Sequence, residues 1–180
     1  MYQSTATAFL VSLVAAATAF AQDVATWRTP PEPIASLITA APPPQLSLSP
    51  CRRFVAIVHT EAMPTLETLA RPHEKLAGLR IDPKTRGPQL GVKTKKVTLR
   101  TIGTLTERDL PLPVGHWRQI RWSADGERIA LERATDAGIE LWLVESLSGT
   151  CKQVPGVILS VALGGGAEWA RDQKHLYCTL

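Results

Sequence analysis

One pattern, a strand, a short polar turn and a second strand, occurs three times in this chain of 180 residues. The copies are LSLSPCRRFVAIV at 46–58, IRWSADGERIALE at 120–132 and AEWARDQKHLYCT at 167–179. Apolar side chains alternate with polar ones on both sides of the turn, which is typical of a β-hairpin that buries one face. A repeated hairpin predicts a repeated sheet, and this limits the possible folds more than any other feature of the sequence.

The middle copy shows the turn chemistry best. Asp125-Gly126 favours a hairpin, because glycine adopts positive φ without steric cost and aspartate accepts hydrogen bonds from the backbone ahead of it. We expect Trp122, before the turn, to share one face with Ile129 and Leu131 after it.

The outer copies depart from the middle one at the turn itself. Cys51 and Arg52 occupy the Asp-Gly positions in the first copy. In the third copy the aspartate remains as Asp172, while Gln173 replaces the glycine. These departures weaken the repeat without removing it.

The segment after the middle hairpin completes a sheet. Ile139, Leu141 and Leu143 lie at alternate positions, and Ser148-Gly149-Thr150 then turns the chain back. Residues 117–155 therefore predict four short antiparallel strands, and about forty residues is the size of one propeller blade. We assign structural roles in the sheets and turns to five residues: Trp122, Asp125, Gly126, Trp142 and Trp169.

The spacing of the copies predicts an insertion. Equivalent positions lie one blade apart between the second and third copies, but much further apart between the first and second. The extra residues, at about 61–91, are interrupted by prolines. We expect a loop with one helical turn at Leu66–Leu69, and we expect Leu76, Leu79 and Ile81 to dock on the sheets.

The fold class that follows is all-β: a partial, open β-propeller of about two to three four-stranded antiparallel blades within residues 46–180. The last blade is expected to be cut off at residue 180. Residues 22–45 are rich in proline and predict an N-terminal arm with a short helix over Ile34, Leu37 and Ile38.

Residues 1–21 predict a signal peptide. An apolar run at 8–17 precedes Ala19-Phe20-Ala21, a small-x-small site for cleavage near Ala21-Gln22. We therefore expect export to the periplasm or the outside, with no stable membrane span after cleavage. An uncleaved anchor is the alternative, although the apolar run is shorter than the roughly 20 residues of a membrane span.

The net charge of +4 and the scattered histidines exclude some functions. The most basic stretch, GVKTKKVTLR at 91–100, lacks the stacking aromatics of a nucleic-acid surface and predicts a solvated edge strand protected by lysines. The three cysteines and four histidines have no zinc-site spacing. We expect no nucleic-acid partner, no metal and no cofactor.

Four segments resemble the N-terminal part of the propeller domain in prolyl oligopeptidase family serine peptidases. They are W-x-T-P-P-x-x-I-x-x-L at 27–37, LSP at 48–50, EAMPTLETLARPHEKLAGLRIDP at 61–83 and WSADG at 122–126. The insertion is similar to that of the glutamyl endopeptidase-like branch, often labelled dipeptidyl or acylaminoacyl peptidases. It carries most of the specificity, because WSADG recurs in many unrelated propellers.

The resemblance implies a C-terminal α/β-hydrolase domain with a Ser, Asp and His triad as the partner of this propeller. The sequence contains no G-x-S-x-G nucleophile elbow, and Ser148 has Ser146 and Thr150 where the glycines would be. We therefore assign no catalytic residue to this chain, which on its own is not expected to be an enzyme.

The function that the resemblance implies is control of peptide access to the hydrolase site. By analogy, Arg80 and Arg86 of the insertion face the hydrolase domain or receive an acidic peptide; the alternative is that both are solvated. Two other hypotheses remain open. The chain could be a free-standing exported binding module that completes its ring by oligomerising, or a decayed remnant that does not fold stably.

Overall fold

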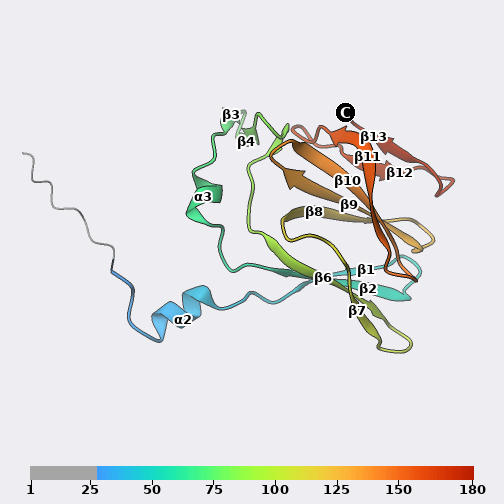
Figure 1. Ribbon diagram of the computed structural model, residues 1–180, viewed down its shortest axis with the longest axis horizontal. Coiled ribbons are helices and arrows are strands. Elements are labelled where there is room, and N and C mark those ends of the chain that lie inside the picture. Colours follow the sequence, from blue (N-terminus) through green and yellow to red (C-terminus); the bar gives the residue numbers. More distant parts are fainter. Residues whose placement is uncertain (1–27) are drawn as a thin grey trace, which may run out of the picture. The chain divides into compact units, whose positions relative to one another are not determined.

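The computed structural model describes residues 28–180, in which strands predominate (Figure 1). The proposed signal peptide and Trp27 lie outside the described residues. The chain divides into two units between Leu37 and Ile38, and each is described by itself. The predicted short helix is present as α2 (Ile34–Thr39), where the Ser36 hydroxyl donates to the Pro33 carbonyl at 2.7 Å.

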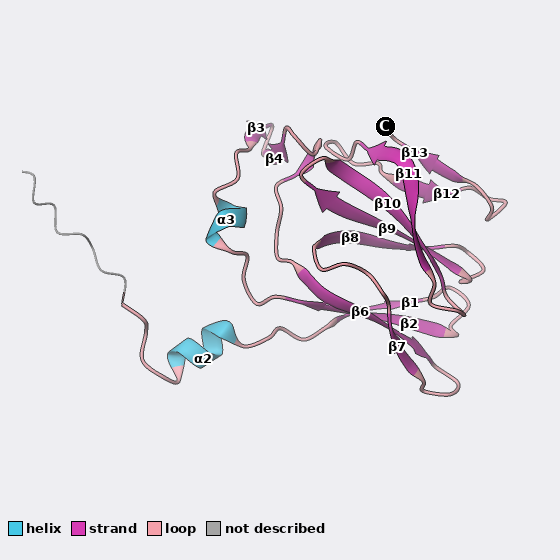
Figure 2. Cartoon of the chain, viewed as in Figure 1, coloured by secondary structure: helices cyan, strands magenta, loops and turns pink. Residues whose placement is uncertain are grey.

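The second unit contains two four-stranded antiparallel sheets and a further hairpin (Figure 2). The first sheet has the order β1-β2-β6-β7, with β1 (Gln45–Leu48), β2 (Phe54–Thr60), β6 (Thr94–Thr101) and β7 (Glu107–Asp109). The central sheet has the order β11-β10-β9-β8, with β8 (His116–Trp122), β9 (Arg128–Thr135), β10 (Gly138–Glu145) and β11 (Cys151–Leu159). The third hairpin pairs β12 (Ala167–Trp169) with β13 (Leu176–Cys178).

The three hairpin turns share one hydrogen-bond pattern. In each, the residue that opens the turn donates its backbone N–H to the carbonyl five residues later and accepts from the N–H three residues later, at 2.9–3.0 Å. The opening residues are Ser49, Ser123 and Ala170. The residue three places after each has positive φ: Arg52 (57°), Gly126 (72°) and Gln173 (58°). The sequence repeat is therefore also a geometric repeat, even where glycine is missing.

The central sheet is buried on both faces. Ile129 and Leu131 of β9 belong to a first core, with side chains from β2 and β6 of the first sheet. Ala130 and Ala134 of the same strand belong to a second core, with Ala167 of the third hairpin. The expectation of one buried face is thus wrong for the middle hairpin, because a neighbouring sheet or hairpin covers each face. As predicted, Trp122 shares the first core with Ile129 and Leu131.

A buried ion pair lies close to the second core. The carboxylate of Glu132, which is only 2% exposed, lies 3.5 Å from Arg118 Nε. Its other oxygen accepts a hydrogen bond from the backbone N–H of Ala167 at 3.3 Å. Glu132 therefore links the central sheet to the third hairpin.

The prediction of an edge strand over 91–100 is wrong. Strand β6 lies inside the first sheet, between β2 and β7. Beyond the short β7, the returning chain still covers this side, because Leu110 N–H donates to the Val97 carbonyl at 2.9 Å and Thr94 N–H to the Gly115 carbonyl at 2.8 Å.

The insertion contains the predicted helical turn, α3 (Leu66–Leu69), and also a small sheet that we did not predict. That sheet consists of β3 (Glu74–Leu76), β4 (Leu79–Asp82) and β5 (Gly87–Pro88). Ala77 and Gly78 join β3 to β4 with φ of 48° and 86°, the pair of positive angles that a tight hairpin needs.

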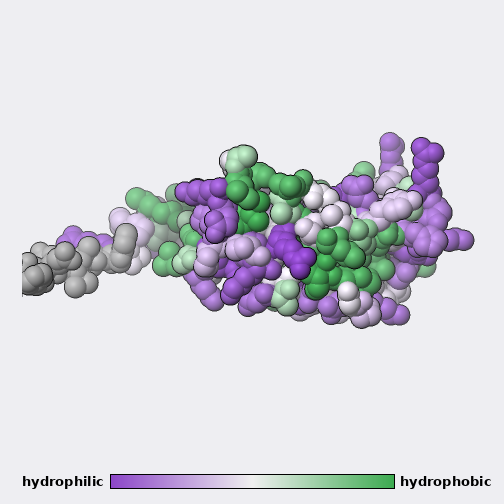
Figure 3. All heavy atoms as spheres, turned by 90° about the horizontal axis from the view of Figure 1, so that it is seen from above, coloured by the Kyte–Doolittle hydropathy of each residue, from purple (hydrophilic) through white to green (hydrophobic). Residues whose placement is uncertain are grey.

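The insertion leaves much apolar surface exposed. Of the three residues expected to dock on the sheets, Ile81 is buried, but Leu76 and Leu79 are 57% and 46% exposed because they lie on the outer hairpin of the insertion. Met63, Leu66 and Leu69 are exposed as well. Figure 3 shows hydrophobic areas separated by hydrophilic ones on the face seen from above.

The described residues form a partial, open β-propeller. Four-stranded antiparallel sheets follow one another along the chain and stack face to face, which is the arrangement of propeller blades. None of the sheets within residues 28–180 closes on itself. Within the same residues, no helix has the length and hydropathy needed to cross a membrane.

Candidate ligand pocket between the insertion and the central sheet

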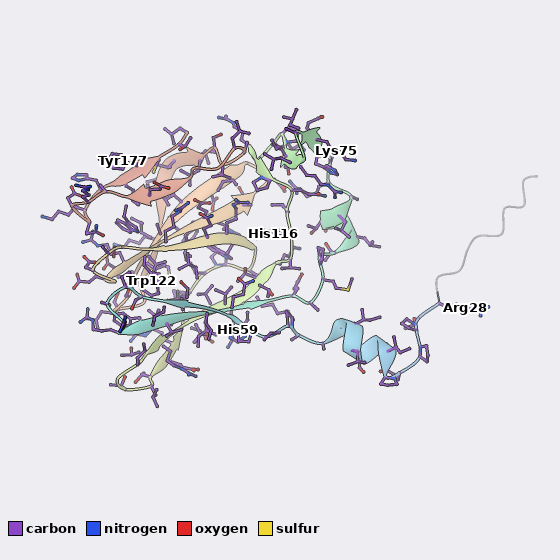
Figure 4. All side chains as sticks on the ribbon, turned by 180° about the vertical axis from the view of Figure 1, so that it is seen from behind. Arg28, His59, Lys75, His116, Trp122 and Tyr177 are labelled. Atoms are coloured by element: carbon purple, nitrogen blue, oxygen red, sulfur yellow. The ribbon has the colours of Figure 1, made fainter. Side chains whose placement is uncertain are left out.

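A pocket of about 300 Å³ lies where the insertion meets the end of the central sheet. The insertion and the segment that returns from it contribute one wall, and β8, β9 and the β9–β10 turn contribute the other. The lining residues are Glu67, Thr68, Arg71, Leu90, Lys93, His116, Arg133, Ala134, Thr135 and Asp136. Figure 4 shows His116 at the end of β8, next to the returning segment.

Backbone hydrogen bonds fix the two walls against each other. Glu61, where the insertion leaves β2, donates its N–H to the Lys93 carbonyl at 2.9 Å, so the two ends of the insertion lie side by side. Thr94 in turn pairs with Gly115. These contacts place Lys93 beside His116 although 22 residues of chain lie between them.

Arg71 joins the insertion to the central sheet. Its guanidinium contacts the Asp82 carboxylate at 3.2 Å and the Asp136 carboxylate at 2.7 Å. Asp82 is nearly buried and also accepts from the Lys84 N–H at 2.9 Å, so it is held by both partners. The hydrogen bond from Arg71 lowers the pKa of Asp136, which stays ionised.

Arg133 is held in place by an acid and an aromatic ring. Its Nη1 lies 3.6 Å from Glu140 Oε2, and its guanidinium carbon lies 5.9 Å from the centre of the Trp117 ring. Trp117 in turn makes an edge-to-face contact with Trp142, and the Trp142 Nε1–H donates to Glu140 at 3.0 Å. Nε of Arg133 is nevertheless buried, and no hydrogen-bond partner for it lies among the described residues.

His116 is the second lining residue with an unsatisfied nitrogen. Its Nδ1 is buried and has no hydrogen-bond partner within residues 28–180. Burial lowers the pKa of His116, and the positive charges of Lys93 and Arg71 lower it further, against the opposing effects of the Val92 backbone and the Glu61 carboxylate. The imidazole is therefore neutral at neutral pH, so it carries one N–H, which the Val92 backbone accepts, and its other nitrogen can only accept.

The charges of the pocket are unevenly matched. Arg71 and Arg133 have acidic partners, whereas Lys93 lies within 4.0 Å of no carboxylate among the described residues. Glu67, on the exposed rim, has no cation within that distance in the same part of the chain. The lining thus holds one unpaired ammonium, that of Lys93, while Oε2 of Glu61, close to His116, is buried without a hydrogen-bond partner in the part of the chain that the structure describes.

The two arginines singled out from the sequence lie outside this pocket. Arg80 is exposed on β4, where Nη1 donates to Gln89 Oε1 at 3.5 Å. Arg86 is exposed in the turn between β4 and β5, and its backbone carbonyl accepts from the Val161 N–H at 2.9 Å. The structure brings neither side chain to the charged groups of the pocket.

The residues given structural roles lie in the sheets and turns. Trp122 Nε1–H donates to Ser47 Oγ at 2.9 Å, across to the first sheet, and Trp169 Nε1–H donates to the Arg121 carbonyl at 2.9 Å. Asp125 accepts from the Ser123 hydroxyl at 2.5 Å and from the Glu127 N–H at 2.9 Å. Within residues 28–180, no group of three or more His, Cys, Asp or Glu side chains is placed to hold a metal ion.

Comparison with known proteins identifies relatives of one functional class, although no family model matches the chain. The chain is 30% identical over 171 residues to a probable chloroplastic glutamyl endopeptidase of Oryza sativa subsp. japonica, which covers 86% of this chain and 18% of the relative. A protein of the same description from Arabidopsis thaliana is 37% identical over 139 residues, which covers 69% of this chain and 14% of the relative. The resemblance seen in the sequence is confirmed. The chain is similar to one segment of these peptidases and spans less than a fifth of their length.

Solved structures with a similar fold include two archaeal peptidases. One is the β-propeller domain of the Trilobed protease from Pyrococcus furiosus, with a TM-score of 0.43 and 17% identity, covering 77% of this chain and 34% of that chain. The other is the Pyrococcus horikoshii acylaminoacyl peptidase, with a TM-score of 0.43 and 15% identity, covering 78% of this chain and 17% of that chain. The strand order and the stacked sheets, rather than these likenesses, identify the fold as an open propeller.

Proposed function

We propose that this chain forms the non-catalytic propeller part of an exported serine peptidase and controls which peptides reach a Ser-Asp-His site in an α/β-hydrolase domain. The observation that carries the proposal is the similarity of most of the chain to one segment of glutamyl endopeptidases. The glutamyl specificity in the names of these relatives suggests acidic peptides as the substrates of the whole enzyme.

Two features support a role in access rather than in chemistry. The sequence has no G-x-S-x-G elbow, so a nucleophile of this class would have to come from another domain. The sheets pack on one another through two buried cores, and packed scaffolds of this kind present loops to a ligand without taking part in bond cleavage.

The proposal includes export through residues 1–21, with cleavage near Ala21-Gln22. Amino-terminal sequencing of the product released by the source cells tests it. A product that starts at or near Gln22 supports export, whereas an intact Met1 in the cell-associated fraction contradicts it.

The first test of the peptidase proposal is an immunoblot of the source cells with an antibody raised against residues 27–37, combined with a fluorophosphonate probe for serine hydrolases. We expect one band several times larger than the 19.6 kDa of this chain, and we expect the probe to label that band. A band at or below 19.6 kDa that the probe does not label would favour the free-standing binding module instead.

The non-catalytic part of the proposal has its own test. The purified chain is incubated with Glu-containing peptides, with and without a serine-directed inhibitor. We expect no cleavage; hydrolysis that the inhibitor abolishes would place a nucleophile in this chain.

A further inference from the structure

We propose that the open edge of β13 is a docking site for an extended strand, supplied by a part of the peptidase outside residues 1–180. The strand that fits has apolar side chains at two alternate positions and an acidic residue directly after the second. The inference rests on the proposed function, because it names a segment of the longer enzyme as the partner. The chain spans less than a fifth of the relatives it matches, so an enzyme of their length has further segments to supply such a strand.

The backbone of β13 is hydrogen-bonded on one side only. Thr179 N–H donates to the Gly166 carbonyl at 3.0 Å, on the side of β12. Hydrogen-bonded and non-hydrogen-bonded pairs alternate along an antiparallel ladder, so Tyr177 also bonds toward β12. The N–H and C=O groups of Leu176 and Cys178 therefore point to the opposite side, and these groups form the open edge. No strand within residues 28–180 pairs with it.

The other two sheets show what covers this edge. Strand β6 pairs with β2 in the first sheet, and β10 pairs with β9 in the central sheet, both antiparallel. Counting from the residue that opens each turn, Leu176 and Cys178 are equivalent to Ile129 and Leu131 of β9. Because the three turns share one geometry, the element that belongs at the open edge is an antiparallel strand.

Strand β10 shows which side chains such a strand needs. Val144 and Trp142 lie opposite Ile129 and Leu131, and all four belong to the first core. A strand in the same register on β13 would point its two equivalent side chains toward the second core. Apolar residues at these two alternate positions would therefore be buried on docking.

The second core has room for this contact, because it is incompletely covered. Leu143, Val154 and Val157 of β10 and β11 pack against it but are only partly buried. The third hairpin lies on the β8 side of this face, where Trp169 Nε1–H donates to the Arg121 carbonyl at 2.9 Å. A strand added beyond β13 would extend the cover toward β10 and β11 and remove apolar surface from water.

The charge of the third turn favours an acidic residue in the docked strand. Arg171 and Lys174 are exposed, and neither lies within 4.0 Å of a carboxylate among the described residues. Asp172, the acid of this turn, already accepts from the Lys174 N–H at 2.9 Å. In the central sheet Glu145 lies 3.5 Å from Arg128, which is equivalent to the residue after Lys174. An acid in the place of Glu145 would thus meet a positively charged turn.

The experiment is a titration of the full chain with the peptide Ac-ELWLVE-NH2, which copies residues 140–145, followed by amide hydrogen exchange measured by NMR. We expect saturating peptide to slow the exchange of the Leu176 and Cys178 amides about tenfold. The Tyr177 amide, which already bonds toward β12, is the internal reference and should change less.

A modified peptide separates strand pairing from apolar adsorption. Methylation of the tryptophan and valine backbone nitrogens keeps every side chain but removes the N–H groups that would pair with β13. This peptide should leave the exchange of Leu176 and Cys178 unchanged. Equal protection by both peptides would overturn the proposal.

Two variants test the edge itself. Cys178→Pro removes an N–H that makes no bond to β12, a position where a strand tolerates proline, and should weaken peptide binding about tenfold. Cys178→Ala is the matched control, because it removes the thiol but keeps the N–H, and it should bind like the parent chain. Thermal melts establish that both are folded, and equal binding by the two variants would contradict the assignment.

Hydrogen exchange of the native product tests the source of the strand. In a product several times larger than 19.6 kDa, the segment that contains 176–178 should exchange more slowly than in the isolated chain. Equal exchange would overturn the proposal. An isolated chain that is already a dimer with slow Leu176 and Cys178 amides would make a second copy the occupant, and would overturn it as well.

The outcomes for the edge and for the proposed function are separable. Peptide binding at β13 by a chain whose native product is no larger than 19.6 kDa would support the edge as a strand acceptor and contradict the peptidase. Absence of protection at β13, with a large native product that a serine-hydrolase probe labels, would overturn the docking edge alone.

Discussion

Replacing Gly126 with alanine should destabilise the fold, because the turn between β8 and β9 offers an added methyl group neither a favourable backbone angle nor space. Gly126 has φ of 72°. A Cβ at this position would overlap the Cys51 sulfur and lie 3.3 Å from Ser49 Cβ, both in the turn of the first sheet. The change therefore affects the packing of two neighbouring turns at once.

The magnitude follows from these two effects. A residue other than glycine in the left-handed region costs about 1–2 kcal/mol, and overpacking a close contact costs about 1–3 kcal/mol. We expect a loss of about 3 kcal/mol in the free energy of unfolding, which for a chain of this length lowers the melting temperature by roughly 6–12 °C. Thermal melts followed by circular dichroism measure it.

Two variants separate the contributions. Arg52 has a positive φ of 57° in the first turn, and Arg52→Gly removes the strain of that angle without creating a steric overlap. The melting temperature of this variant should equal or slightly exceed that of the parent chain. Cys51→Ala combined with Gly126→Ala removes the overlapping sulfur and should recover part of the loss. A Gly126→Ala chain that melts within about 1 °C of the parent would refute the reasoning.

Other positions make further predictions. Glu132→Ala should lower the free energy of unfolding by about 3 kcal/mol in urea titrations, because it leaves Arg118 without its buried partner; a loss below about 1 kcal/mol would show that the pair is unimportant. Trp122→Ala should lower the free energy of unfolding by about 2–3 kcal/mol in the same assay. This is less than the usual cost for a fully buried tryptophan, because Trp122 is half-buried. An unchanged urea midpoint would contradict its place in the first core. Hydrogen bonding by His175 lowers the pKa of Asp172 to about 2 in the folded chain. Because this pKa is below the unfolded-state value of about 4, the ionised Asp172 stabilises the fold above about pH 4. The stabilisation is lost as the pH falls through about 2. Asp172→Asn should therefore make the melting temperature depend less steeply on pH between about pH 2 and 5. An unchanged slope would assign the acid dependence to other groups.

Local features of this fold could be predicted from the sequence because each depends on residues close together in the chain. The Asp125-Gly126 turn and the alternation around Ile129 are of this kind, and so is α3, where the Thr65 hydroxyl accepts from the Thr68 N–H at 3.2 Å to cap the helix. Their geometry follows from turn preferences and from the period of a strand.

Features that depend on distant segments could not be predicted. Whether β6 lies at an edge is decided by the path of the chain after residue 101, which no pattern within 91–100 records. The exposure of Leu76 follows from the direction of the β3–β4 hairpin.

The candidate pocket belongs to this second class. Arg71, Lys93, His116 and Arg133 come together only through the return of the insertion and the pairing of β8 with β9. Each of them has an ordinary sequence neighbourhood. The one available signal was the long insertion itself, which drew attention to Arg80 and Arg86 instead of the charged residues near its base.

The burial of the central sheet on both faces also sets an order for unfolding. Strands β8, β9 and β10 all contribute side chains to the first core, and β9 and β10 also contribute to the second. Separating β9 from β10 therefore disrupts two layers of packing at once. The first sheet and the third hairpin each lose contacts on one side only. In native-state hydrogen exchange the amides of β9 and β10 should therefore be the slowest in the chain, while those of β7 and β13 exchange through smaller openings that leave the middle intact.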